Sequence, residues 1–307
     1  MPGATRPRFH AALLAPRQWP AWCGAGLMWL LARLPWPVLY GLGRGLGHVT
    51  VRIRNQRRKT AKRNISLCFP QLDATAQRQL LDTHMRELGM MPVEFAMGWL
   101  GSDRAIGRIP ARLEGLEHLH AARARGHGVL LVGGHFSHLE LCARMVSRRL
   151  RIAAMYRRMD STVFEWLVLR ARLDYADAMF DKYDLRGTVK YLRDGGIVWY
   201  APDQDMGGKD NVFVPFFGVP AATITATHHL ARLGRAEVIP FFHRREADGS
   251  YTLRLEAPLA DFPSADAGAD TARINQAIEA MVRAAPAQYL WVHKRFKTRP
   301  PGSASLY

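Results

Sequence analysis

Cysteine is scarce in this chain, and its scarcity excludes two kinds of site. Only Cys23, Cys68 and Cys142 occur in 307 residues, and they lie far apart. Neither a disulfide framework nor a CxxC metal or redox site is therefore available. We expect the folded part of the chain to face the cytosol. Two interpretations are open for Cys142, a nucleophile or a small buried hydrophobe, and we favour the second.

Acidic residues are also few. The chain has 26 Asp and Glu against 43 Lys and Arg, a formal net charge of +17. Such an excess attracts polyanions. Nucleic acid, an anionic membrane surface, lipid phosphates and an acidic carrier protein would each fit it, so charge alone does not select the partner.

Long uninterrupted apolar runs are lacking. The longest run, 19–34, is apolar apart from Arg33 and has tryptophans toward both ends, as segments at a membrane interface do. It is short for a hydrocarbon core of about 30 Å, so a tilted span and an interfacial helix are both open. A second run, 36–46, is interrupted by Pro37 and by glycines. No small-residue cleavage site follows, which argues against a removable signal peptide.

A basic tract follows the apolar runs. Its cations are Arg52, Arg54, Arg57, Arg58, Lys59, Lys62 and Arg63. Each cation beside anionic headgroups contributes on the order of 1 kcal/mol, and such tracts favour the cytoplasmic side. A solvated basic helix without lipid contact is the alternative. We predict a membrane anchor with the start of this tract over 1–50, and one catalytic domain over 51–307.

The rest of the chain alternates between short apolar runs and helical periodicity. Buried strands are expected at 128–134, 152–156, 196–201 and 238–242, an edge strand at 251–256, and helices at 78–100 and 272–285. This order predicts an α/β fold with a mixed, mostly parallel sheet flanked by helices, preceded by the N-terminal anchor helix.

The segment after the first buried strand has the residues for proton transfer. Gly133 and Gly134 lead to His135, and Glu140 follows five residues later. In open α/β sheets, sites form beyond the carboxyl ends of strands. If Glu140 lies in the first helical turn, its carboxylate can hold the His135 tautomer whose free nitrogen accepts a proton. A substrate hydroxyl can then act as the nucleophile, and no catalytic serine is needed.

Two other interpretations of this segment are open. Ser137 and Glu140 also have the spacing of a capping box, in which Glu140 only satisfies backbone donors. A metal site built from His135, His138 and Glu140 lacks the HExxH spacing, so we predict no metal. His138 is the weaker of the two histidine candidates.

Several blocks of the sequence resemble one enzyme family. The pair His135 and Glu140 matches the H-x4-D/E signature of the glycerolipid acyltransferase superfamily. The other similar blocks are RNISLCFP at 63–70, MYR at 155–157, VWYAPDQD at 198–205, VFVPFF at 212–217 and QYLWVHKRFKTRP at 288–300. Together they resemble the late acyltransferases of lipid A biosynthesis, the lauroyl/myristoyl family, over essentially the whole chain. The lauroyl-type branch is the most similar, although the blocks do not indicate acyl length.

The resemblance implies a reaction and its partners. An acyl group would pass from acyl carrier protein to a 3-hydroxyl on an acyl chain of a Kdo-bearing lipid A precursor. His135 would be the general base and Glu140 its orienting partner, with no cofactor beyond the acyl-carrier thioester as co-substrate. The implied location is the bacterial inner membrane, on anionic lipids, with the catalytic domain on the cytoplasmic face and no nucleic-acid partner.

Other charged residues are candidates for substrate binding. Arg157 could bind a lipid phosphate or support developing charge, or it could pair at the surface with Asp160. Asp203 and Asp205 lie in a block that resembles the family's active-site lining, but turn chemistry after Pro202 explains them equally well.

More distant basic residues are candidates for contacts with acidic groups. Lys182 and Arg186 are candidate phosphate contacts. Arg295, Lys297 and Arg299 form a basic run that could meet an acidic carrier protein or lipid headgroups, although such runs are usually just solvated.

The alternatives differ in class. An acyltransferase of the same superfamily could act on lysophospholipid, ornithine lipid or another glycolipid. A non-catalytic basic protein could bind lipid or nucleic acid at a membrane surface. A metal-dependent hydrolase is the third alternative.

Overall fold

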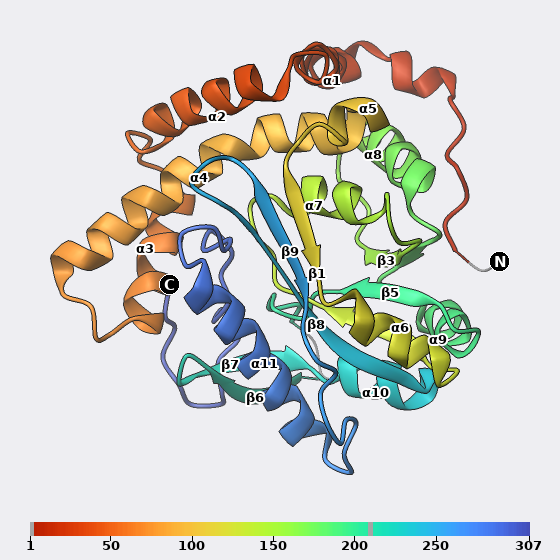
Figure 1. Ribbon diagram of the computed structural model, residues 1–307. Coiled ribbons are helices and arrows are strands. Elements are labelled where there is room, and N and C mark those ends of the chain that lie inside the picture. The colour runs from red at the N-terminus through yellow and green to blue at the C-terminus, as the bar shows by residue number, and fades with distance from the viewer. Residues whose placement is uncertain (1–2, 208–210) are drawn as a thin grey trace.

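A seven-stranded mixed sheet forms the centre of the molecule, with helices on both faces (Figure 1). The computed structural model describes residues 3–207 and 211–307. Its helices are α1 (Trp19–Leu31), α2 (Trp36–Thr50), α3 (Gln56–Cys68), α4 (Ala74–Leu100), α5 (Asp103–Ile106), α6 (Leu116–Ala124), α7 (Leu139–Val146), α8 (Thr162–Tyr175), α9 (Leu185–Arg193), α10 (Ala226–Gly234) and α11 (Ala267–Ala284). Its strands are β1 (Ala111–Glu114), β2 (Gly128–Val132), β3 (Ala153–Tyr156), β4 (Met179–Asp181), β5 (Ile197–Tyr200), β6 (Asn211–Phe216), β7 (Val219–Ile224), β8 (Ala236–Arg245) and β9 (Tyr251–Leu255).

The strand order confirms the predicted α/β class with a mixed, mostly parallel sheet. The large sheet runs β1-β9-β8-β2-β5-β3-β4, and β6 and β7 form a separate antiparallel ribbon. Every neighbouring pair in the large sheet is parallel except β8 and β9. The four expected buried strands correspond to β2, β3, β5 and β8. The expectation that 251–256 is an edge strand was wrong, because the short strand β1, which is not an apolar run, pairs with its outer side.

Both faces of the central strands are buried, which explains their continuous apolar sequence. Leu130 and Val132 of β2 pack in the cluster that includes residues of α3, α10 and α11, whereas Val129 and Leu131 pack in the cluster that includes residues of α4 and α7. Each such side chain contributes roughly 1.5–3 kcal/mol when fully buried. Burial on both faces therefore holds β2 firmly in the sheet, and with it the start of the loop that follows.

Helices α1 and α2 lie along the outside of α4 (Figure 1). Pro37 lies in the first turn of α2, where its missing N–H costs no helical hydrogen bond. The glycines that we expected to interrupt this run lie inside a continuous helix. At Gly89 an added Cβ would come 2.3 Å from the backbone nitrogen of Gly47, so glycine lets α2 and α4 touch.

Large apolar side chains on these helices face outward. Among them, Trp19 and Leu30 are about 60% exposed, and the others are Leu27, Trp29, Val38, Leu42, Leu46 and Val49. Of the helices in the described ranges, none has both the length and the apolar character needed to cross a bilayer.

Candidate active site

His135 lies just beyond the carboxyl end of β2, in the loop that leads to α7. Two glycines make the loop possible. A Cβ at Gly133 would lie 3.1 Å from the carbonyl oxygen of Phe241, and one at Gly134 would lie 3.2 Å from a methyl group of Ile278. A larger residue at either position would have to displace backbone or core atoms, so glycine brings His135 close to the sheet.

The partner of the His135 ring is Asp203, which follows β5. Nδ1 of His135 lies 2.6 Å from Oδ1 of Asp203, and the backbone N–H of His135 donates to Oδ2 at 2.8 Å. The Asp203 side chain is almost completely buried. With Nδ1 turned to the carboxylate, Nε2 is the nitrogen left to exchange a proton with substrate.

His135 and Asp203 shift each other's pKa. Burial lowers the pKa of His135, but the charge and hydrogen bond of Asp203, with a smaller effect from Glu140, outweigh burial and raise the pKa above its usual value. Burial likewise opposes ionisation of Asp203, but His135 and then Arg295 lower its pKa to about 2. Asp203 is therefore a carboxylate at neutral pH.

Glu140 has other partners. Nε1 of Trp99 donates to Glu140 at 2.7 Å, and Arg172 of α8 binds both carboxylate oxygens, one of them through Nε at 3.2 Å. The expected orienting contact from Glu140 to the His135 ring is thus replaced by Asp203.

The capping-box alternative does not hold either. Helix α7 starts after His138 without a side-chain cap, and the hydroxyl of Ser137 lies 3.4 Å from Nδ1 of His138 instead. The Glu140 carboxylate, engaged by α4 and α8, is turned away from the backbone donors at the start of its own helix.

A cavity of about 250 Å³ opens beside the two signature residues. His135, Glu140, Arg157 and Arg172 contribute polar groups to it. Its apolar walls include Leu139, Val146, Ile152, Met155, Met179 and Phe241. The His135 side chain is 26% exposed and lines this space, so an imidazole stands at the wall of a mainly apolar cavity.

The other predicted site residues fall into different places. Arg157 lines the cavity and also pairs with Asp160 at 2.7 Å, and both side chains are largely exposed. An exposed pair of this kind is worth at most about 1 kcal/mol, so Asp160 holds Arg157 only weakly. Lys182 stacks on Tyr183, and Arg186 is exposed on α9; neither lines the cavity.

Asp205 holds the C-terminal segment in place. Its carboxylate accepts the backbone N–H of Thr298 at 2.6 Å, the hydroxyl of the same threonine at 3.0 Å and the backbone N–H of Gly207 at 3.0 Å. The structure therefore separates the two aspartates of the 198–205 block: one holds His135 and the other holds the chain end.

Sequence reasoning missed two functional neighbours of the signature pair and misplaced one arginine. Trp99 and Arg172 sit in helices whose local pattern gives no sign of a site. Arg295 is buried rather than solvated, and it donates to the carbonyl of Ala222 at 2.8 Å and to the hydroxyl of Thr223 at 2.7 Å. Its place in the last resembling block was the one available signal.

Comparison with known proteins identifies the family of the chain. Residues 6–298 match the family described as bacterial lipid A biosynthesis acyltransferase. The chain is 42% identical to the lipid A biosynthesis lauroyltransferase of Escherichia coli K12 over 303 residues, which cover 98% of this chain and 99% of that one. It is 39% identical to the palmitoleoyltransferase of the same organism over 98% of both chains, and 29% identical to its myristoyltransferase over 98% of this chain and 94% of that one. The chain belongs to the bacterial lipid A biosynthesis acyltransferase family, as its resemblance indicated.

Proposed function

We propose that the enzyme transfers a fatty acyl group from acyl carrier protein to a 3-hydroxyl on an acyl chain of a Kdo-bearing lipid A precursor. The observation that supports it is an imidazole, held by a buried carboxylate, at the wall of an apolar cavity. A thioester and an alcohol need a general base and room for an acyl chain, and this arrangement supplies both.

His135 acts as the general base. Its Nε2 takes the proton of the acceptor hydroxyl while the oxygen attacks the thioester carbonyl. A new C–O bond forms, the C–S bond breaks, and the proton passes from Nε2 to the leaving thiolate. Asp203 stabilises the transient imidazolium and keeps the productive tautomer, because its carboxylate accepts from Nδ1.

Glu140 acts as a positioning residue in this mechanism. Through Trp99 of α4 and Arg172 of α8 it joins three helices around the cavity, and its negative charge also helps raise the pKa of His135. Arg157, at the cavity and only weakly held by Asp160, is our candidate for a lipid phosphate.

The acyl chain of the donor occupies the apolar part of the cavity. Likeness to relatives does not assign its length, since the two relatives at 42% and 39% identity are named for different acyl groups, lauroyl and palmitoleoyl. We keep the lauroyl-type donor as the first to test.

The enzyme attaches to the inner membrane through α1 and α2, which lie in the interface. Both helices have exposed apolar side chains, and the exposed cations Arg57, Lys59 and Lys62 follow on α3. Apolar side chains beside a basic tract are the pattern of interfacial helices on anionic lipid. The catalytic domain then faces the cytoplasm, where acyl carrier protein is its partner.

The test is acylation of defined acceptors by purified protein. Acyl-carrier thioester is incubated with a Kdo-bearing lipid A precursor, a lysophospholipid or ornithine lipid in separate reactions, and products are weighed by mass spectrometry. Only the lipid A precursor should gain one acyl mass. Transfer to another acceptor alone would replace the proposed substrate, whereas His135→Ala that keeps full turnover would refute the mechanism. A protein that binds vesicles but transfers no acyl group to any acceptor would be a binding protein.

A further inference from the structure

A second cluster of reactive side chains lies behind the catalytic loop. His138, Cys142 and His243 are fully buried, and one possible ligand atom from each lies within 4.8 Å of the other two. His138 and Cys142 are four residues apart at the start of α7, where the N–H of Cys142 donates to the carbonyl of His138. This spacing places both side chains on one helical face, opposite His243 of β8.

The imidazole of His243 is unsatisfied in this position. Neither of its ring nitrogens has a hydrogen-bond partner, although the side chain is completely buried. A buried polar group left without a partner destabilises the folded state. The contacts of His138 are long, 3.2 Å to the carbonyl of His243 and 3.4 Å to the hydroxyl of Ser137. A ligand between the rings would give His243 the partner that it lacks.

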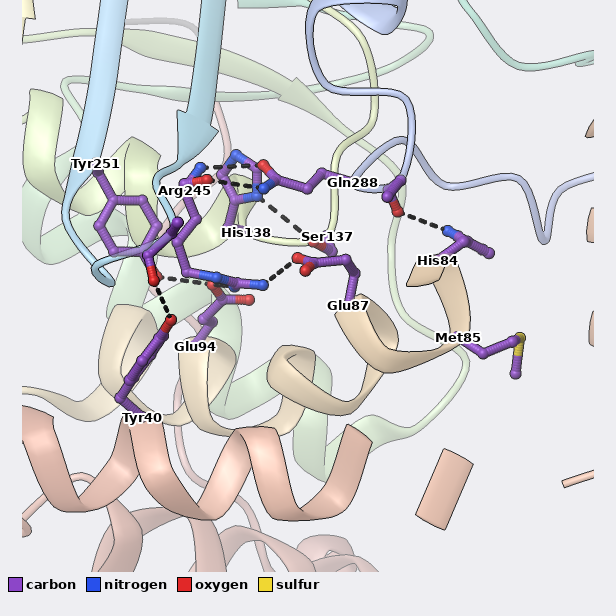
Figure 2. A network of polar contacts seen from close by, with 12 residues as sticks. Tyr40, His84, Met85, Glu87, Glu94, Ser137, His138, Arg245, Tyr251 and Gln288 are labelled. Atoms are coloured by element: carbon purple, nitrogen blue, oxygen red, sulfur yellow. Dashed lines mark hydrogen bonds and ion pairs between the residues drawn. The ribbon is translucent and has the colours of Figure 1, made fainter. Parts of the chain in front are cut away.

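A buried network of charged side chains lies beside the three residues. Figure 2 shows Arg245 between Glu87 and Glu94, with His138 close by. One oxygen of Glu94 has no partner, although Tyr251 and Arg245 bind the other.

We propose that His138, Cys142 and His243 form a binding site for one zinc ion. One thiolate and two imidazoles are a donor set that zinc prefers, and a water completes four ligands. With Zn–S near 2.3 Å and Zn–N near 2.0 Å, tetrahedral donors stand about 3.5 Å apart, so the three side chains must close by about 1 Å. Cys142 releases its proton on binding.

The position of this site gives it a structural role. It joins the first turn of α7 to β8, three residues after His135 in the chain. Zinc there would fix the end of the catalytic loop without touching substrate. The inference stands apart from the proposed acyl transfer, since metal content is measured without turnover.

Metal analysis of untagged, full-length protein tests the site. Protein purified without chelators and dialysed against zinc-free buffer should carry one zinc per chain by plasma mass spectrometry. Cys142→Ala and His243→Phe should each lose it, while Cys68→Ala, which removes the other buried cysteine, should keep it. Replacing zinc with cobalt should give a thiolate-to-cobalt absorption band in the wild type and in Cys68→Ala, and no such band in Cys142→Ala.

Two results would overturn the proposal. One is folded wild-type protein with far less than one zinc per chain after zinc is supplied during expression. The other is zinc that stays unchanged in Cys142→Ala or His243→Phe, which would place it on the surface. If Cys142→Ala does not fold, His243→Phe and the cobalt spectrum of the wild type decide the matter.

Discussion

Replacing Asp203 by Asn tests which carboxylate controls the catalytic histidine. Asp203 accepts two hydrogen bonds from His135, whereas Glu140 is bound by Arg172 and Trp99. If Asp203 sets the tautomer, asparagine will disturb it, because a side-chain amide can donate to Nδ1 and leave the proton on Nε2. Nε2 would then be unable to accept the proton of the acceptor.

The size of the effect follows from the pKa of Asp203. A decrease from 3.8 to about 2 means that the fold favours the carboxylate by roughly 2 kcal/mol, and this is the net value after burial has opposed it. By reciprocity, removing the charge should lower the pKa of His135. Loss of a correctly oriented general base costs about 10²–10⁴ in rate.

The assay is the pH dependence of kcat/KM for the acyl-carrier thioester, measured with the acceptor at a saturating concentration. His135 must be neutral to act as base, so activity in the wild type should rise through a pKa above the usual histidine value. In Asp203→Asn the plateau should fall at least about 100-fold, and the acid limb should move to lower pH. Asp205→Asn, whose carboxylate binds Thr298 instead, is the matched control and should leave the acid limb in place. An Asp203→Asn enzyme with an unchanged acid limb and a plateau within a few-fold of wild type would refute this assignment.

The pH dependence of the free energy of unfolding is a second, independent test of the His135–Asp203 pair. Because the pKa of Asp203 is lowered in the folded state, its contribution is complete above pH 3.8 and is lost as the pH falls through about 2. The pKa of His135 is raised, so its contribution is present below about 6.5 and is lost as the pH rises through the folded value. Urea unfolding of Asp203→Asn should show a flatter dependence in both windows than the wild type.

Three further changes test the rest of the site. Glu140→Gln leaves Arg172 unpaired, so the free energy of unfolding measured in urea should fall by up to about 3 kcal/mol. The double variant with Arg172→Met should lose less than the sum of the two single losses. Additive losses would contradict the pairing. Ala154→Phe, at the wall of the cavity, should shift competition between donors toward shorter acyl chains, whereas an unchanged product ratio by mass spectrometry would place the chain elsewhere. Leu30→Ser on α1 and Val49→Ser on α2 should each reduce sedimentation with anionic vesicles about tenfold. The acyl-transfer rate on a detergent-dispersed acceptor should stay unchanged. Full vesicle binding by both variants would refute the membrane role of these exposed side chains.

The main features of the sheet could be predicted from the sequence because its central strands are buried on both sides. Continuous apolar runs mark β2, β3, β5 and β8, and the helical periods between them require crossover connections. The place of His135 followed from the same logic, since the loop after a parallel strand lies at the edge of the sheet where sites form. Four strands were not predicted. Strand β1 has two charged residues among its four, β4 has only three residues, and β6 and β7 each contain a proline, which is unusual inside a strand.

The partner of His135 could not be derived from local spacing. Asp203 lies 68 residues further along the chain and reaches the ring only because β5 is the hydrogen-bonded neighbour of β2. Sequence predicts that both strands exist but not that they are adjacent, because strand order depends on packing across the whole sheet. The Asp-rich turn after β5 was the signal present, and turn chemistry explained it equally well.

The position of Glu140 has a cause in the packing of α4 on α7. A Cβ at Gly98 would come 2.9 Å from the backbone of Glu140, so glycine lets α4 contact the first turn of α7 directly. Trp99, the next residue of α4, then lies within reach of the carboxylate, and Arg172 approaches it from α8. Since the loop from Gly133 to His138 turns His135 toward β5, a carboxylate five residues later faces the helices and not the ring. Glu140 therefore follows His135 with the H-x4-E spacing but lies at the junction of α4, α7 and α8. The carboxylate that binds His135, that of Asp203, comes instead from the segment after β5.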